Sequence, residues 1–363
     1  MTEEQFLEHR LTARLNFSLS DNGKIQQIIA TIDGYKLAWN LTSTLSLEFL
    51  KSLEKNTLVS STGSSTRIEG SKLSDEQVEL FLRQTKMKKL ETRDEQEVVG
   101  YLEMMRQIFD IYKEIELSER TIKQIHSTLL RYSTKDDKHR GGYKTQSNQV
   151  VAINEQSEVI GIIFDPSTPE NTPEEMKQLL VWVEEALRNR IIHPLIILAN
   201  FIFEFLCIHP FKDGNGRVSR VLTNLILLQQ EYVFAKYVAH EKLIEDTKIE
   251  YYMALRKATN TWKTDKEDVT SWLFYFLDII RQQGDKVMLL TKQEATEHLL
   301  NENQSKVYNL FLNNHPNLLG RKAIAEKTGI SIKTIEAIIK TLVSLKKIEK
   351  QGRGSGTKYK LKR

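Results

Sequence analysis

The chain has few residues of the kinds that cross-link or interrupt a fold. A single cysteine, Cys207, stands in 363 residues, which excludes an internal disulfide and a zinc site built on thiolates. Only six prolines occur, and segments such as EEMKQLLVWVEEAL carry apolar residues at three-to-four spacing, so we predict a mainly α protein. The longest apolar run, residues 194–208, is shorter than the roughly 20 residues of a membrane span and contains Asn200 and Glu204.

The N-terminal residues MTEEQFLEHRLTAR are polar and charged and do not resemble a signal peptide. In the whole chain 40% of the residues are hydrophobic and 28% are charged, as in ordinary globular domains. We therefore expect a soluble, cytoplasmic protein without membrane contacts. The sequence leaves the oligomeric state open.

Charge is distributed unevenly along the chain. Residues 304–363 contain 14 Lys or Arg and three acidic residues, which gives +11, whereas the whole chain carries +4. The first 303 residues therefore carry −7. A mildly acidic body and a strongly basic end predict two different kinds of partner.

The pattern of apolar residues divides the chain into four parts. Residues 1–115 are predicted to form a helical region whose first 25 residues are extended or turn-rich, and residues 116–283 a helical core. Within this core, alternating and β-branched residues around the turn NEQSE predict a short β-hairpin over 149–164. Residues 284–303 are predicted to be a partly helical linker.

Residues 304–363 predict three helices and then two strands around a Gly-rich basic turn, which is similar to a winged helix-turn-helix domain. The third helix of such a domain enters the DNA major groove, but this one offers few base-reading side chains beyond Lys333, Thr334 and Lys340. We expect the domain to bind DNA or to dock a protein. DNA binding through phosphate contacts would be salt-sensitive and weakly specific.

Residues 208–220, IHPFKDGNGRVSR, separate two apolar runs and carry more chemistry than a connector needs. Because a residue before proline avoids the α region, the preceding helix should stop at His209 and leave its imidazole at the helix end. An imidazole, with its ordinary pKa of about 6.5, suits proton transfer near neutral pH. His209 is therefore the candidate base.

The residues after His209 predict an anion site. Gly214 and Gly216 can take positive φ and let amide groups converge, and a helix that starts near Arg217 would aim its positive end at the same point. Arg217 and Arg220 lie three apart and can both reach a polyphosphate, while Asp213 is a hard oxygen donor for the Mg²⁺ that accompanies it. The combination predicts phosphoryl or nucleotidyl transfer, and the alternative is an ordinary turn. A Walker A pattern is missing, which argues against a P-loop enzyme.

The stretch HPFKDGNGRVSR resembles the Fic family motif, HPFx[DE]GNGRxxR, at every defining position. Fic proteins typically transfer AMP from ATP to a hydroxyl side chain of a target protein and of themselves. The resemblance implies that His209 is the general base, that Asp213 holds Mg²⁺ (or Mn²⁺) between the phosphates, and that Arg220 contacts the γ-phosphate. It also implies further phosphate contacts, from Gly214, Asn215, Gly216 and Arg217.

Two further segments are similar to parts of Fic proteins. The segment 143–164 resembles the flap that clamps the target in extended form. The similarity of EYYMALRKATN implies that Tyr251 lies near the adenine, and a core position on an amphipathic helix is an equal alternative.

The stretch SSTRIEG resembles the inhibitory motif of the family, [ST]xxxE[GN], with Ser65, Glu69 and Gly70 at its defining positions. The resemblance implies a short helix at about 60–72 whose Glu69 pairs with Arg220 in the place of the γ-phosphate. One carboxylate and one phosphate would then compete for one guanidinium.

Taken as a resemblance, these motifs imply a mainly α protein with a Fic-type helical core, a small β-hairpin flap and a C-terminal winged helix. They imply an adenylyltransferase that modifies a Ser, Thr or Tyr hydroxyl of a target and of itself, and that is inhibited by Glu69. Two alternatives stay open. One is an enzyme on the same scaffold that mainly removes AMP or uses another nucleotide, and the other is a DNA-binding regulator whose Fic site senses a nucleotide.

Overall fold

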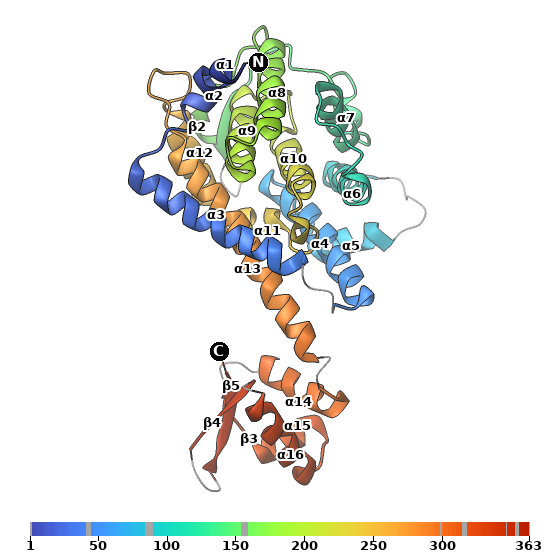
Figure 1. Cartoon of the computed structure of the whole chain (residues 1–363). Coiled ribbons are helices and arrows are strands. Elements are labelled where there is room, and N and C mark those ends of the chain that lie inside the picture. The colour runs from blue at the N-terminus through green and yellow to red at the C-terminus, as the bar shows by residue number, and fades with distance from the viewer. Residues whose placement is uncertain are drawn as a thin grey trace. The chain divides into compact units, whose positions relative to one another are not determined.

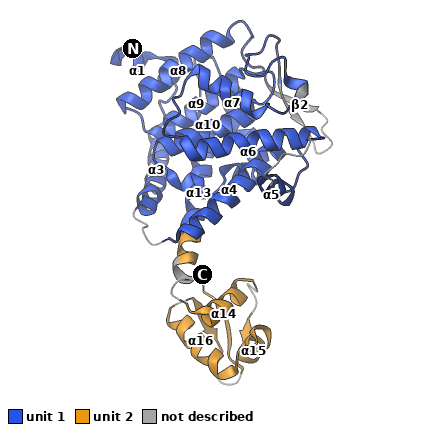
Figure 2. Ribbon diagram, turned by 90° about the vertical axis from the view of Figure 1, so that its right-hand side faces the viewer, with its two compact units in different colours: residues 1–288 blue, residues 289–363 orange. Residues whose placement is uncertain are grey.

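The computed structural model describes residues 2–40, 45–83, 90–153, 159–297, 300–313, 318–345, 347–352 and 356–362 (Figure 1). The chain divides into two compact units, Met1–Met288 and Leu289–Arg363, which Figure 2 colours separately. The described residues are mostly helical, so the predicted mainly α fold class is confirmed. None of the described helices is long and apolar enough to cross a membrane.

Unit 1 is built from helices packed around one core. Their bounds are α1 (Glu3–Glu8), α2 (Arg10–Ala13), α3 (Leu19–Asn40), α4 (Leu47–Ile68), α5 (Asp75–Arg83), α6 (Arg93–Ile111), α7 (Glu119–Leu129), α8 (Thr172–Asn189), α9 (Pro194–Ile208), α10 (Asn215–Gln229), α11 (His240–Asp246), α12 (Lys248–Thr259) and α13 (Thr270–Glu297). Two 3₁₀ turns occupy Thr134–Asp136 and Val233–Lys236. Helix α13 continues past residue 288, through most of the segment that the sequence predicts as a linker.

Helices α9 and α10 form the centre of unit 1. Every residue of α9 from Leu195 to Ile208 is buried, and α8 and α10 both pack against this helix. Helix α10 is buried over most of its length as well. Helices that are apolar on all sides belong to the core of a protein. The loop 209–214, which joins these two helices, is therefore held at both of its ends by the core.

The predicted hairpin is present beside this centre. Strand β1 (Val150–Ile153) pairs antiparallel with β2 (Val159–Phe164), with register shifts after Val150 and after Ala152. The predicted turn, NEQSE, lies outside the described residues. Helix α12 packs against β2, which brings the hairpin next to a helix that lines the candidate site.

The first 25 residues are not extended, contrary to the prediction. Thr2 and Gln5 form a reciprocal capping box that starts α1, and α3 already begins at Leu19. Phe6 and Leu11 are buried in the main core. Helices of four to six residues are too short to show a helical period, and tertiary contacts supply the stability that short helices lack.

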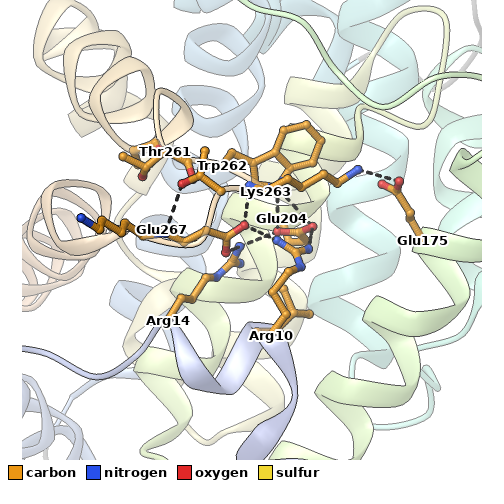
Figure 3. A network of polar contacts seen from close by, with 12 residues as sticks. Arg10, Arg14, Glu175, Glu204, Thr261, Trp262, Lys263 and Glu267 are labelled. Carbon is orange, nitrogen blue, oxygen red and sulfur yellow. Dashed lines mark hydrogen bonds and ion pairs between the residues drawn. The ribbon is translucent and has the colours of Figure 1, made fainter.

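A buried ion network explains how these short helices are held (Figure 3). Arg14, which is 6% exposed, donates to Glu204 Oε2 at 2.6 Å and to Asn200 Oδ1 at 2.7 Å, both on α9. Arg10 pairs with the other oxygen of Glu204, and Trp262 donates its ring N–H to the same carboxylate. The network anchors the N-terminus to α9, the helix that ends at the candidate base.

Unit 2 has its own elements and its own core. Helices α14 (Glu302–Asn313), α15 (Arg321–Thr328) and α16 (Ile332–Ser344) precede strands β4 (Ile348–Gln351) and β5 (Lys358–Leu361). A two-residue strand, β3 (Leu319–Gly320), pairs with β5 and gives a sheet of order β3-β5-β4. Two residues carry no periodicity, so the sequence did not predict β3. Apolar side chains from all three helices and from the sheet form this second core.

We expect Arg14→Met to lower the free energy of unfolding of unit 1 by about 3 kcal/mol, because it leaves a buried carboxylate short of a counter-charge. The loss stays at the low end of the range for broken buried pairs, since Arg10 and Trp262 still bind Glu204. Urea unfolding followed by tryptophan fluorescence reports on unit 1, which contains all four tryptophans. Lys55→Met, which breaks a half-exposed pair with Glu79, is the control and should cost about 0.5 kcal/mol. A similar small loss in both variants would contradict a structural role of the network.

Candidate active site

His209 ends α9 in the left-handed conformation, with φ 52° and ψ 60°, directly before Pro210. Its Nδ1 lies 3.2 Å from the carbonyl oxygen of Leu206. A carbonyl oxygen only accepts, so Nδ1 carries the proton and Nε2 is left as the basic nitrogen. Burial, and next the nearby cation of Lys144, lower the pKa of His209 to about 4. The imidazole is therefore neutral at physiological pH and able to take up a proton.

The loop after His209 places Gly214 at φ 80°, as predicted for an anion-binding turn, but α10 begins at Asn215, two residues before the expected start. Gly216 consequently lies in the first turn of α10, and the prediction that it adopts positive φ is wrong. Because Gly216 has no side chain, Glu69 can approach the start of α10 closely; a Cβ at this position would overlap Glu69 Oε1. The side chain of Asn215 is turned toward the loop, where it bonds both the N–H and the C=O of Phe211.

Arg220, on the second turn of α10, is 3% exposed and donates three hydrogen bonds to the end of α4. Its Nη2 donates to Glu69 Oε1 at 2.7 Å and to the Ser65 carbonyl at 3.0 Å, and its Nε donates to Ser65 Oγ at 2.8 Å. The structure thus brings together the residues of two motifs that lie 151 positions apart in sequence. Burial would lower the pKa of Arg220, but the Glu69 carboxylate outweighs it and raises the pKa above its ordinary value.

The segment that carries Glu69 differs from the short helix at about 60–72 that the sequence implies. It is the end of the 22-residue α4, with Glu69 as the C-terminal cap and Gly70 at φ 103° behind it. The small residues of VSSTGSST lie inside α4, and most of them are buried. Helix α4 packs against α6 and α11, and small side chains allow this close contact.

Asp213 and Arg217 belong to a second charged cluster beside Arg220. Asp213 Oδ2 accepts from Arg93 at 2.6 Å, and its Oδ1 accepts from Arg217 at 3.2 Å and from the Gly214 N–H at 2.6 Å. Burial would raise the pKa of Asp213, but Arg217 and Arg93 hold it below its ordinary value. Arg217 also lies 3.1 Å from Glu97. The sequence did not single out Arg93 or Glu97, because both lie on α6 in an ordinary amphipathic pattern.

The acidic side chains present fit a magnesium ion that arrives with a phosphate ligand. No group of three His, Cys, Asp or Glu in the described part of the chain could hold a metal by itself. A single partly exposed carboxylate, such as that of Asp213, is typical of Mg²⁺ sites in which phosphates and waters complete the octahedron.

One small cavity, of about 60 Å³, links Glu69, His209 and Arg220, whereas Asp213 and Arg217 do not line it. It is bounded by Glu69, His209, Gly216 and Arg220, and by further side chains from the surrounding elements, which are Phe164, Leu206, Tyr251, Tyr252 and Leu255. Such a volume holds a few water molecules.

The two tyrosines on α12 take different places around this cavity. Tyr251 is 6% exposed and packs edge-on against Trp272 and Tyr275, so it belongs to the core as well as to the cavity wall. Tyr252 also lines the cavity and is partly exposed. The sequence singled out only the first of these two adjacent aromatics, because both lie in one helical pattern that does not show which side faces the site.

His126 on α7 supports the loop 209–214 through a ring stack and a hydrogen bond. Its ring stacks on Phe211 with a centroid distance of 3.9 Å and is fully buried. Nδ1 accepts from the Gly141 N–H at 2.9 Å, so Nε2 carries the proton that bonds the Asp213 carbonyl at 3.0 Å. Burial is the main reason why its pKa is lowered to about 4, which keeps the ring neutral and in one tautomer.

We expect His126→Phe to keep the ring stack but to lose both hydrogen bonds, which should destabilise unit 1 by about 2–4 kcal/mol at pH 7.5. The depressed pKa of His126 gives stability that is present above the unfolded value of about 6.5 and is lost as the pH falls toward 4. The stability gap between parent and variant should therefore narrow by about 1.4 kcal/mol per pH unit between roughly pH 6 and 5. Urea unfolding at four pH values measures the gap, and a gap that does not change with pH would contradict the assigned neutral state.

Comparison with known proteins relates the region of this site to one protein family. The model of the Fic/DOC family matches residues 116–227, from α7 to α10. Protein adenylyltransferase fic-1 of Caenorhabditis elegans is 33% identical over 95 residues, which are 26% of this chain and 17% of that protein. A probable protein adenylyltransferase of Aquifex aeolicus is 26% identical over 167 residues, or 41% of this chain and 51% of that protein. The chain thus spans between about a sixth and about half of these curated relatives.

Solved structures with similar folds agree with this match. A Fic family protein from Desulfovibrio desulfuricans superposes with a TM-score of 0.58 at 20% identity and covers 96% of this chain and 97% of its own. Residues 134–508 of Fic-1 from Caenorhabditis elegans give a TM-score of 0.58 at 22% identity, over 75% of this chain and 73% of that one. At these identities the likeness concerns the fold. The motif, the matched segment 116–227 and the fold agree in their similarity to Fic proteins.

Proposed function

We propose that this protein is an adenylyltransferase that transfers AMP from ATP to a Ser, Thr or Tyr hydroxyl of a protein, its own chain included. The observation that carries the proposal is the cavity in which a neutral His209 and the buried cation of Arg220 face the same space. A base and a fixed cation on one cavity are what nucleotidyl transfer requires. The names of the curated relatives support the same reaction class.

In the proposed reaction, His209 Nε2 accepts the proton of the attacking hydroxyl. The hydroxyl oxygen forms a bond to the α-phosphorus, and the bond from that phosphorus to the bridging oxygen breaks, so that pyrophosphate leaves. Arg220 and the N–H groups at the start of α10 offset the charge of the phosphates. The Nδ1–H bond to Leu206 fixes the ring orientation throughout.

ATP and Mg²⁺ (or Mn²⁺) are the proposed substrate and ion, and Asp213 is the residue that would hold the ion. When bound, the ion neutralises phosphate charge and favours departure of pyrophosphate. Asp213 is prepared for this role because His126 and the Gly214 N–H fix its backbone and one of its carboxylate oxygens.

Glu69 is the proposed inhibitor of this reaction. Its carboxylate lies on Arg220 and walls the cavity that the phosphates would fill. A phosphate and this carboxylate cannot occupy the same side of one guanidinium, so ATP would bind without its γ-phosphate in the productive place.

The segment 143–164, which contains strands β1 and β2, is the proposed docking element for the target. Among the described residues its sheet contains only β1 and β2, so each strand has an outer edge. An extended segment of a target protein can add to such an edge through main-chain hydrogen bonds.

The first test is incorporation of label from α-labelled ATP and Mg²⁺ into the protein itself and into a cell lysate. We expect Glu69→Gly to label at least ten-fold more than the parent, Glu69→Gln to lie between them, and Glu69→Gly with His209→Ala to lose the signal. The gain follows from removal of the competing carboxylate, and the loss from removal of the base. Strong labelling that survives His209→Ala would refute the assigned base. No labelling despite ATP binding would refute the transferase and favour AMP removal or nucleotide sensing.

A second function is proposed for unit 2, as a winged-helix module that binds duplex DNA through phosphates. The observation that favours it is the set of exposed polar and basic residues on α16, which are Lys333, Thr334 and Lys340, within a segment of charge +11. Protein docking is the alternative. Because Glu336 on the same helix pairs with Arg321, part of this face is already neutralised.

For DNA binding we expect the full chain to bind random-sequence duplex with an affinity that falls steeply between about 50 and 200 mM salt. Lys333→Gln and Lys340→Gln should each lower the slope of log affinity against log salt by about one. Fluorescence anisotropy across the salt series measures the slopes, and Lys306→Gln on α14 is the control with the same charge change. Equal effects of all three substitutions would indicate a net-charge effect and no defined DNA surface.

A further inference from the structure

Lys144 binds the main chain on both sides of the candidate base. It lies in the segment that leads into β1 and is 4% exposed. Its backbone N–H donates to the carbonyl of Pro210 at 2.8 Å, and its Nζ donates to the carbonyl of Ile208 at 3.0 Å. These are the carbonyls of the residues immediately before and after His209. One lysine therefore hydrogen-bonds the main chain on both sides of the candidate base.

A second residue of the same segment extends this contact. Asn148 Oδ1 accepts from Lys144 Nζ at 3.1 Å, and Asn148 Nδ2 donates to the carbonyl of Phe211 at 3.1 Å. A segment of five residues therefore bonds three of the four carbonyls from residue 208 to residue 211. Two residues beyond Asn148 the chain enters strand β1 of the hairpin.

The conformation of His209 explains why such support is needed. A left-handed residue at a helix C-terminus is normally glycine, because a Cβ is crowded in that conformation. A non-glycine residue holds this strained conformation only where its surroundings fix it. The last carbonyls of a helix also lack partners within the helix, and Lys144 supplies one for Ile208.

We propose that Lys144 is a positioning residue that holds His209 in its left-handed conformation and, through Asn148, couples this conformation to the hairpin. The proposal deepens the transferase reaction and rests on it. Lys144 reaches neither the cavity wall nor a reacting atom, and it acts through the peptide groups on either side of His209.

The charge of Lys144 adds a second effect on the same imidazole. Of the charged groups with the largest effect on the pKa of His209, Lys144 disfavours the protonated ring, whereas Glu69 and Asp213 favour it. Arg220 is a further cation that faces His209 across the cavity. Burial lowers the pKa of Lys144 to about 8, so it is still mostly a cation at pH 7. Loss of this cation should therefore raise the pKa of His209 from about 4 toward its ordinary 6.5.

The kinetic test compares Lys144→Met and Lys144→Arg in the Glu69→Gly background. We expect Lys144→Met to lower kcat for self-labelling at least ten-fold, with KM for ATP changed less than two-fold, because the base is misplaced while the nucleotide site is intact. Lys144→Arg keeps a donor and a charge and should restore kcat to within about three-fold. Lys236→Met is the matched control. That lysine is also largely buried, and it donates to a main-chain carbonyl on α6, that of Phe109.

A measurement that does not depend on catalysis tests the role of Lys144 independently of the proposed transferase activity. NMR titration of ¹³C-labelled histidine in the full chain, with His209→Ala to assign the signal, gives the pKa of His209 without nucleotide. We expect it to rise in Lys144→Met and to stay low in Lys144→Arg. If the Glu69→Gly parent does not label at all, the transferase fails, and the titration alone decides whether Lys144 controls His209.

Two results would overturn the positioning role. One is an unchanged kcat together with an unchanged His209 titration in Lys144→Met, and the other is a loss that Lys236→Met reproduces. If Lys144→Met does not fold, Asn148→Ala takes its place, since Asn148 is only partly buried. It removes the bond to Phe211 and one partner of Lys144, and it should lower kcat in the same direction by about three-fold. No effect of Asn148→Ala would then count against the proposal.

Discussion

A buried guanidinium needs a counter-charge, and much of the site follows from the way in which Arg220 obtains one. Arg220 is 3% exposed and lies in a helix of the core, so it cannot turn toward water when no ligand is present. Ser65 supplies two hydrogen bonds but no charge, and Glu69 supplies the carboxylate. The residue that we propose as inhibitor therefore also neutralises a cation that the fold has buried. Under the proposed function, removal of Glu69 would open the guanidinium to phosphate and would take away part of its electrostatic stabilisation, which is a common trade-off between activity and stability.

The end of α4 that presents Glu69 is fixed more firmly than the side chain itself. Arg67 bonds Glu245 on α11 at 2.6 Å, and Lys248 on α12 donates to the Ile68 carbonyl at 2.8 Å. The Glu69 side chain, in contrast, is one-third exposed and held at its tip by one guanidinium. Release of the carboxylate requires rotation of one side chain toward solvent, and the helix can stay in place. Gly216 keeps the path clear, because any Cβ there would meet the carboxylate.

The sequence predicted the parts of this site that are local and missed the parts that are assembled by folding. His209 and Arg220 lie within one motif, and the stop of α9 before Pro210 follows from backbone sterics alone. The Glu69–Arg220 pair spans 151 residues and could be expected only from the resemblance to a family. Lys144 and Arg93 were not expected, because a lysine before a strand and an arginine at a helix start are common on any surface. Their roles depend on which main-chain oxygen or carboxylate the fold brings within 3 Å, and no local pattern encodes that.

The two charged clusters of the site are arranged in the same way. Arg220 is paired with Glu69, where a phosphate is proposed to bind, and Asp213 is paired with Arg93, where a magnesium ion is proposed to bind. In each pair the group that would contact the ligand is held by the core or by loop hydrogen bonds, and its present partner has the more exposed side chain. The Arg93 side chain is 48% exposed and that of Glu69 33%, so each can return to water with little desolvation to reverse. Because ATP and its ion arrive together, they would replace a carboxylate and a guanidinium at once, and the net charge change of the protein contacts would be zero. Such an exchange would require no rearrangement of α9 or α10, because Glu69 ends α4 and Arg93 begins α6, both outside these two helices.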